Sequence, residues 1–247
     1  MAAPLELDQL PVLNRYATEI PEPEVLNSGA IIPVNKPSGW SSFQVVKFFR
    51  NRIGVKKVGH GGTLDPLATG LLLLCAGKAT RSVSLIHQLQ KVYRAHITLG
   101  ASTPSYDGGT EFDESAGWEH IRRKDVEFTL KQRFKGRILQ RPPAWSALKK
   151  EGKRYYKLAR EGKPETPPPR EVDIYSIRVL RCKLPVIEIE VVCGKGTYIR
   201  SIAHDLGLAL ESRAWLSGLQ REAIGVFSIS EAWTPESFDR FTSNRRV

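Results

Sequence analysis

A glycine-rich loop, Gly59 to Gly70, holds the residues best suited to chemistry in this chain. Four glycines within twelve residues allow positive φ and a close approach of the backbone to a ligand such as a phosphate. The loop lacks the GxxxxGK[ST] spacing of a P-loop. Asp65 precedes Pro66, which favours an extended backbone, and this carboxylate could equally cap a turn. His60 could act as a base, although packing is commoner for a lone histidine.

Regular elements on both sides must position this loop. Ala30 to Asn35 predicts a short strand that ends in the turn Asn35 to Gly39. Ser41 and Ser42 can cap a helix, whose expected apolar face consists of Phe43, Val46, Phe49 and Ile53. The apolar run Leu71 to Ala76 predicts a buried strand directly after the loop, and a helix is expected from about Lys78 to Leu89.

The rest of the chain mixes strands and helices without a βαβ rhythm. Strands are predicted at Lys91 to Leu99, Val172 to Leu180 and Val186 to Cys193. A helix is predicted at Val126 to Phe134, and Ile199, Ile202, Leu206 and Leu210 share one face of another. Ser102 to Gly117 is polar and Gly-rich, which predicts a loop. We therefore expect an α+β fold with a mixed or antiparallel sheet.

Composition limits the class of protein. With 247 residues and 27.7 kDa, the chain suits one large domain, or one domain with a small satellite. Its 41% hydrophobic and 26% charged residues exclude a disordered or fibrous chain. The net charge of +11 and the pI of about 9.7 favour a polyanionic partner, with nucleic acid the first candidate.

The charge is unevenly distributed. Residues 1–28 hold five acids and one base among four prolines, which predicts an acidic arm packed outside the core. The stretch from Lys131 to Arg170 contains thirteen Lys or Arg residues but only three Glu, and aromatic residues are interspersed among the basic ones. This pattern favours a surface that follows a phosphate backbone over a solvated lysine-rich face.

Several classes lack support. The three cysteines are far apart and the five histidines scattered, so we expect no metal site and a reducing compartment. The N-terminus has no secretory pattern, and the longest apolar run, Leu71 to Ala76, is too short to span a bilayer. We expect a cytoplasmic protein with no membrane contact. No coiled-coil seam is visible, so a monomer is expected.

Five ordered segments resemble one enzyme family. VGHGGTLDPLATGLLLLCAGKATR, from Val58, closely resembles the GHxGTLDPxAxGxL motif of the TruB-type tRNA pseudouridine(55) synthases. Four further segments resemble that family's other motifs: NKPSGWSS from Asn35, KVYR from Lys91, QRPPAWSALK from Gln140, and KGTYIRSI from Lys195 with Asp205-Leu206-Gly207. The resemblance spans about four-fifths of the chain, Ala30 to Phe227.

The resemblance implies an activity and its catalytic residues. A tRNA uridine at position 55, in the TΨC loop, would be flipped out, detached at N1, turned and rejoined through C5, without a cofactor. Asp65 would be the nucleophile, which suits an ionised carboxylate that needs no base. Arg200 would hold Asp65 in place and ionised. A structural ion pair on a helix is the alternative interpretation of Arg200, and it is compatible with this role. Tyr93 would stack on the uracil and assist removal of the C5 proton. Attack at C1′, addition at C6 and a glycal route all stay open.

The resemblance also implies binding residues. His60 would fill the space that the flipped base vacates, and Leu219 would line the uracil pocket, although a leucine at that spacing is commonly core. The other implied substrate contacts are Lys36, Pro37, Gly61, Thr63, Leu64 and Tyr198. The implied RNA-backbone contacts are Arg81, Arg141, Lys149, Lys150, Lys153 and Arg154. The fold would be a mainly antiparallel central sheet flanked by helices, with residues 131–170 as a thumb-like insertion that grips the tRNA T-arm.

Two departures from the family pattern stand out. Trp145 occupies the position of a Tyr or Phe, which keeps the apolar bulk and changes any hydroxyl contact. Only twenty residues follow Phe227, so we expect a catalytic domain at 29–232, a tail at 233–247 and no RNA-binding PUA domain. Two other functions remain alternatives: a non-catalytic RNA-binding or RNA-folding module, and a nucleoside hydrolase that releases free base.

Overall fold

The computed structural model describes residues 3–243, and the chain divides into two compact units. Unit 1 contains the chain up to Lys91 and from Gln220 onward, and unit 2 is Val92–Leu219. One boundary follows the first residue of β4 (Lys91–Leu99), and the other lies inside β12 (Ala214–Ile224). Because both boundaries lie in strands rather than in linkers, the sequence carries no sign of this division.

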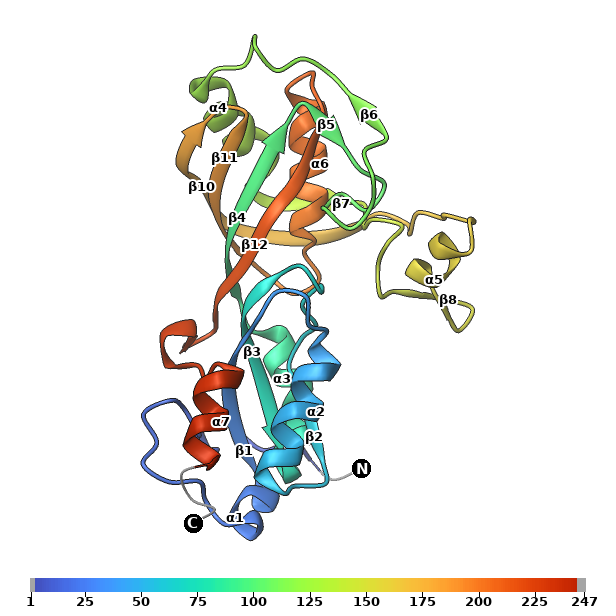
Figure 1. Cartoon of the computed structure of the whole chain (residues 1–247). Coiled ribbons are helices and arrows are strands. Elements are labelled where there is room, and N and C mark those ends of the chain that lie inside the picture. Colours follow the sequence, from blue (N-terminus) through green and yellow to red (C-terminus); the bar gives the residue numbers. More distant parts are fainter. Residues whose placement is uncertain (1–2, 244–247) are drawn as a thin grey trace. The chain divides into compact units, whose positions relative to one another are not determined.

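Unit 1 is built on strand β3 (Thr69–Ala76), which follows the glycine-rich loop (Figure 1). β1 (Ala30–Lys36) pairs antiparallel with it, so that Lys36 lies opposite Gly70. β2 (Val58–His60) pairs antiparallel with the other end of β3, while β12 pairs parallel at Thr69 and Gly70. A short β13 (Phe227–Ser228) pairs with β12.

Both faces of β3 are covered, which explains its continuous apolar run. On one face, Leu72 and Leu74 pack against α2 (Ser42–Ile53) and α7 (Pro235–Ser243). On the other, Leu71 and Leu73 pack against the region that was expected to be one helix. That region consists of a 3-10 helix, η2 (Gly77–Ser82), followed by α3 (Val83–Gln88).

Helix α2 begins as predicted, but the prediction that Phe43 belongs to its buried face is wrong. Ser41 caps the helix, accepting from the backbone of Gln44, and Val46, Phe49 and Ile53 are buried. Phe43, by contrast, is 67% exposed. Ser42 takes the inward position beside it, because its hydroxyl exchanges hydrogen bonds with the backbone of Leu64.

Both ends of the described chain contribute to the core of unit 1. Leu10, Leu13 and Leu26 are buried, which corrects the expectation that the N-terminal arm lies outside the core. Their irregular spacing among acids and prolines has no period that would reveal this. The arm contains η1 (Leu7–Gln9) and α1 (Pro23–Ser28). The expected C-terminal tail forms α7, after the 3-10 helix η3 (Ile229–Glu231); its residues 244–247 lie outside the described residues.

Unit 2 holds the strands in the order β12, β4, β11 (Val186–Cys193), β10 (Arg170–Lys183) and β7 (Gly136–Gln140). The alternating side chains of β11 pack inward at Ile187, Ile189, Val191 and Cys193, as predicted. Helices α4 (Arg123–Arg133) and α6 (Ile199–Ala209) cover that face. With mostly antiparallel pairs, the fold confirms the predicted α+β class.

Two insertions leave the sheet of unit 2. The predicted loop after β4 contains only a two-residue pair, β5 (Ala101–Ser102) with β6 (Glu114–Ser115). Between β7 and β10 the chain forms a projecting segment with β8 (Lys149–Lys150), β9 (Lys153–Arg154) and α5 (Tyr155–Arg160) (Figure 1). This segment lies within the basic stretch at residues 131–170.

Candidate active site

Asp65 lies half-buried in a loop of unit 1 that is anchored on both sides of it. On one side, Leu64 is buried and its backbone N–H donates to the Ser42 hydroxyl at 3.0 Å. On the other, the N–H of Ala68 donates to the carbonyl of Asp65 at 3.1 Å, which closes a turn. The backbone position of Asp65 is therefore set by α2 and by a tight turn.

Lys36 ties the same loop to the turn before α2. Its side chain is fully buried, and Nζ donates to the carbonyls of Pro37 at 2.9 Å, Trp40 at 2.6 Å and Pro66 at 3.0 Å. Burial lowers the pKa of Lys36 from 10.5 to about 8; the charge of Asp65 opposes this change, and the charge of Arg221 adds to it. Lys36 thus holds the backbone next to Asp65 at Pro66 and also interacts electrostatically with the Asp65 carboxylate.

Arg221 is a buried residue of this region that the sequence analysis missed. Its side chain is 1% exposed, its Nε donates to the carbonyl of Leu71 at 2.7 Å, and Nη2 donates to that of Gly62 at 3.0 Å. The available signal was strand alternation, because Arg221 follows Leu219 by two residues in β12 and therefore shares its strand face.

His60 ends β2 in a half-buried position. Burial lowers the pKa of His60, and the charges of Arg221 and His87 lower it further, while a backbone contact with Gly62 acts in the opposite direction. The imidazole is therefore neutral at physiological pH, which suits contact with a base better than contact with a phosphate.

The neighbours of His60 differ in their freedom to touch a ligand. Gly61 is buried against Ile86, where a Cβ would lie 2.3 Å from Ile86 Cγ2. Its implied role in substrate binding is thus limited to the backbone. Thr63 is exposed, and Pro37 is half-buried beside Lys36.

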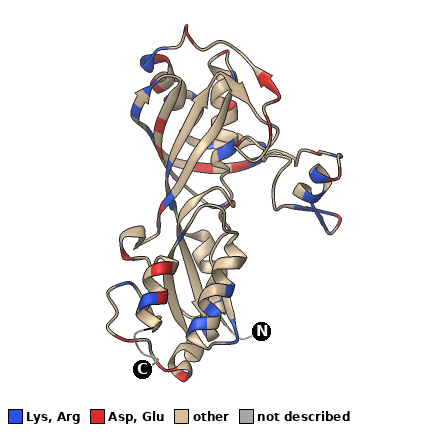
Figure 2. Ribbon diagram, in the orientation of Figure 1, with Lys and Arg blue, Asp and Glu red and all other residues tan. Residues whose placement is uncertain are grey.

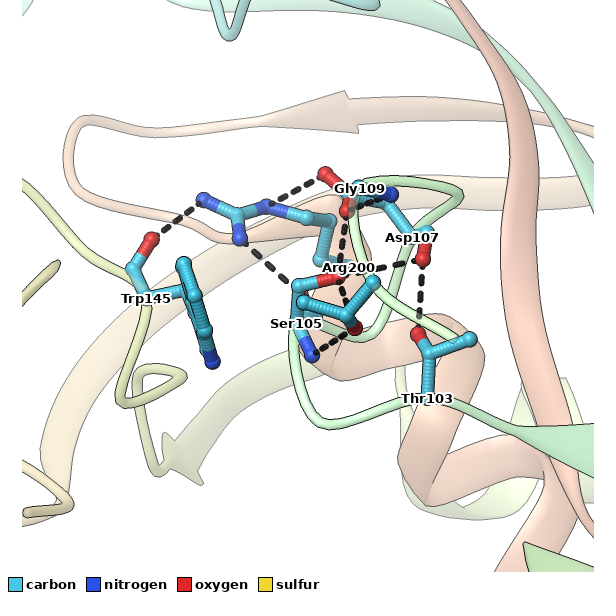
Figure 3. Close-up of polar contacts among 7 residues, drawn as sticks. Thr103, Ser105, Asp107, Gly109, Trp145 and Arg200 are labelled. Atoms are coloured by element: carbon cyan, nitrogen blue, oxygen red, sulfur yellow. Dashed lines mark hydrogen bonds and ion pairs between the residues drawn. The ribbon is translucent and has the colours of Figure 1, made fainter. Parts of the chain in front are cut away.

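Arg200 is buried in unit 2, in the first turn of α6 (Figure 3). Nη1 donates to the carbonyl of Ser105 at 2.9 Å and Nη2 to that of Trp145 at 3.1 Å. Nε lies 3.6 Å from Oδ2 of Asp107, in an ion pair with both side chains largely buried. Asp65 lies in the other unit, so its pairing with Arg200 stays a prediction.

The partner loop of Arg200 is itself highly ordered, and the sequence analysis treated it only as a polar connection. Oδ1 of Asp107 accepts from the Ser105 hydroxyl at 2.6 Å and from the Gly109 N–H at 2.9 Å (Figure 3). Thr103 donates its hydroxyl to the Asp107 carbonyl at 2.7 Å. The Asp107 carboxylate is thus held in one orientation toward the guanidinium of Arg200.

The other segments around Arg200 are connected by buried polar contacts. Gln140 is buried at the end of β7, and its amide binds both the N–H and the carbonyl of Tyr198, at 2.8 and 3.0 Å. The Ser201 hydroxyl donates to the carbonyl of Arg141 at 2.8 Å. These contacts join two of the motif segments, around Gln140 and Lys195, and so fix the start of α6.

Tyr93 and Leu219 are both half-buried and pack against the hydrophobic core of unit 2. For Leu219 this includes the core role that the sequence analysis left open. Partial exposure leaves each side chain an accessible surface for a ligand as well.

The predicted RNA-backbone residues are exposed. Lys149, Lys150, Lys153 and Arg154 form the short hairpin of β8 and β9 (Figure 2), and Lys150 pairs with Glu165. Arg141 is exposed at the base of this segment, and Arg81 is exposed on η2 in unit 1. Within unit 2, the hairpin concentrates cationic side chains on a projecting element.

Among residues 3–243, no group of three or more His, Cys, Asp or Glu side chains is placed to hold a metal ion. No helix in the same range is long and apolar enough to cross a membrane.

Comparison with known families and proteins gives consistent matches. Residues 50–199 match the family model described as TruB family pseudouridylate synthase, N-terminal domain. The chain is 47% identical over 225 residues to tRNA pseudouridine synthase B of Bacteroides fragilis, covering 89% of this chain and 96% of that protein. It is 46% identical over 226 residues to the protein of that name from Parabacteroides distasonis, with the same coverage.

Solved structures agree at the level of the fold. A crystal structure of a Cbf5-Nop10-Gar1 complex matches with a TM-score of 0.66 and 30% identity over 87% of this chain. An H/ACA RNP bound to a substrate RNA containing 2′-deoxyuridine matches with a TM-score of 0.66 and 26% identity over 92%. The chain spans only 54% and 60% of the matched chains in these two structures.

Proposed function

Since this chain belongs to the TruB family of pseudouridylate synthases, we propose that it converts a uridine of tRNA, at position 55 in the TΨC loop, into pseudouridine. The observation that carries the proposal is the loop around Asp65. Its backbone is held by Ser42, Lys36 and Arg221, and Lys36 is coupled electrostatically to Asp65. A nucleophilic carboxylate needs orientation and a nearby cation more than it needs a base.

The reaction balances without an added reagent. The N1–C1′ bond of the target uridine breaks, the base turns in place, a C5–C1′ bond forms, the C5 proton leaves and N1 takes up a proton, so the product is an isomer of the substrate. Asp65 begins this sequence by attack at C1′, by addition at C6 or by a proton abstraction that yields a glycal. Tyr93 stacks on the uracil and assists removal of the C5 proton. His60, kept neutral, occupies the space that the flipped base leaves.

Arg200 completes the proposed catalytic set as the charge partner of Asp65. Its contacts with Asp107, Ser105 and Trp145 support this role because they leave the guanidinium little rotational freedom. An arginine fixed in this way stabilises an ionised carboxylate without losing side-chain entropy when substrate binds.

The exposed hairpin of β8 and β9 is the proposed grip on the T-arm. Replacing Lys149, Lys150, Lys153 and Arg154 by Gln should make the slope of log K for tRNA binding against log salt concentration less steep by about three. This is the change expected for the loss of four phosphate contacts. Arg178→Gln is the control, because this exposed residue lies on β10, outside the projecting hairpin, where it pairs with Glu190. An unchanged slope in the fourfold variant would refute the role of the hairpin.

We further propose that the protein acts as a monomer in the cytoplasm.

Tritium release from a tRNA transcript labelled with [5-³H]uridine tests the function directly. The wild type should release tritium, Asp65→Asn should release none while still binding tRNA, and a transcript with cytidine at position 55 should give none. Release of free uracil would favour a nucleoside hydrolase. Binding without release by either protein would favour an RNA-binding or RNA-folding module.

A further inference from the structure

One planar guanidinium spans the loop that carries Asp65. Arg221 donates from Nη2 to the carbonyl of Gly62 and from Nε to that of Leu71. Gly62 stands before Asp65, just after the end of β2, and Leu71 stands after it, near the start of β3 (Thr69–Ala76). The two hydrogen bonds therefore fix the distance between the ends of the loop.

The strand register explains why Arg221 can reach both ends. In β3, Gly70 has Lys36 opposite it in β1 and Arg221 opposite it in β12. A Cβ on Gly70, whose φ is +106°, would lie 2.3 Å from the carbonyl oxygen of Arg221 and 2.6 Å from its nitrogen. This approach, possible only for glycine, brings the backbone of Arg221 against the end of the loop.

Arg221 also shares the electrostatic environment of the loop. Both Arg221 and Lys36 are fully buried, and the charge of Arg221 acts on Lys36 and on His60. Burying a guanidinium is costly, and an apolar side chain of similar volume would fill the same space at lower cost. The guanidinium makes two hydrogen bonds to the loop backbone that an apolar side chain could not make, so its role goes beyond filling space.

We propose that Arg221 is a positioning residue for the isomerisation, holding the segment between Gly62 and Leu71 so that Asp65 meets the flipped uridine at its reacting position. Arg221 acts on the reaction through the loop backbone. The inference rests on the proposed function, because it presupposes that Asp65 is the nucleophile.

The test compares Arg221→Met, Arg221→Lys and Phe238→Leu in single-turnover tritium release with saturating enzyme. Phe238→Leu is the matched control, because Phe238 is fully buried in unit 1 among α2 and α7, away from the loop contacts. Arg221→Met should lower the single-turnover rate about 100-fold, the cost of a misplacement of about 1 Å. The Kd for tRNA should stay within about threefold of the wild type, because the lost contacts are internal. Arg221→Lys should recover part of the rate, since an ammonium can satisfy one of the two carbonyls.

The outcomes separate the two levels of the argument. If the wild type releases no tritium, the proposed function itself fails. If it does release tritium and Arg221→Met reacts at the wild-type rate, or no slower than an equally destabilised Phe238→Leu, Arg221 is merely structural and the inference is overturned. If Arg221→Met does not fold, Arg221→Lys decides: a loss of about tenfold supports the inference, and an unchanged rate overturns it.

Discussion

Gly61→Ala probes how tightly the loop that carries Asp65 is packed where it leaves β2. Gly61 is buried, and its N–H donates to the carbonyl of Leu73 at 2.8 Å. An added Cβ would lie 2.3 Å from Cγ2, 2.8 Å from Cβ and 3.1 Å from Cδ1 of Ile86, a fully buried residue of α3. All three distances are shorter than the roughly 3.5–4.0 Å of a normal carbon contact.

Overpacking of this kind costs about 1–3 kcal/mol, and the loss of glycine entropy in the unfolded chain returns about 0.4–1 kcal/mol. We therefore expect Gly61→Ala to lower the free energy of unfolding by about 1–2 kcal/mol. Gly59→Ala is the matched control two residues earlier, where the nearest atom to a Cβ, Cγ2 of Thr80, lies at 3.7 Å. That distance is an ordinary contact, so Gly59→Ala should keep only the entropy gain and raise the free energy of unfolding by about 0.4–1 kcal/mol.

Urea unfolding of both variants measures this difference through the midpoint, with the slope as a check that unfolding stays two-state. Adding Ile86→Ala removes Cγ2 and Cδ1, so Gly61→Ala should cost about 1 kcal/mol less in that background. If Gly61→Ala and Gly59→Ala are equally stable, or if Ile86→Ala gives no relief, the close packing of the loop against α3 is refuted.

Three further predictions concern charged groups. Asp107→Asn keeps the hydrogen bonds to Ser105 and Gly109 but removes the charge beside Arg200. The rate of single-turnover tritium release should fall about tenfold, with tRNA binding retained. An unchanged rate would show that the contacts of Arg200 with the carbonyls of Ser105 and Trp145 suffice to orient it. Burial lowers the pKa of Lys36 from 10.5 to about 8, so between these pH values the unfolded protein binds this proton more strongly than the folded one. As the pH rises from 8 to 10.5, the free energy of unfolding of the wild type, measured in urea, should therefore rise by about 1–2 kcal/mol relative to Lys36→Met. Parallel pH profiles of the two proteins would contradict this. Burial raises the pKa of Asp205 from 3.8 to about 6, so its stabilising contribution is present below pH 3.8 and is lost as the pH rises through 6. Asp205→Asn should therefore be about 1–2 kcal/mol more stable than the wild type at pH 7.5 and show no gain at pH 4. A gain of equal size at both pH values would disprove the assignment.

Much of the fold was predictable because its strands have simple periods. The alternation of β11 gave the buried face correctly, and the continuous apolar run of β3 correctly indicated burial on both sides. The motif around Asp65 was visible for a different reason: its glycines and Pro66 are local signals that need no tertiary partner to be recognised.

The residues that escaped prediction depend on distant partners. Asp107 lies in a polar loop and gains meaning only from Arg200, far along the chain. Arg221 lies in β12, a strand that the sequence pattern did not predict, and its role depends on the register that places it beside Gly70. Phe43 was assigned to the core by its spacing, yet Ser42 faces inward because its hydroxyl has a partner in Leu64. Periodicity reports hydrophobicity, and it does not report a hydrogen bond that changes which side chain turns inward.

The burial of β3 on both faces also sets an order of local opening. A strand enclosed by two hydrophobic layers and paired on both edges exchanges its amide hydrogens only when much of its surroundings opens. The loop with Asp65 is attached directly to this strand, whereas the hairpin of β8 and β9 pairs only with itself. Amide exchange should therefore be slow throughout Leu71 to Ala76 and fast in the hairpin. The hairpin proposed to grip RNA can then open and close many times while the loop with Asp65 stays in place.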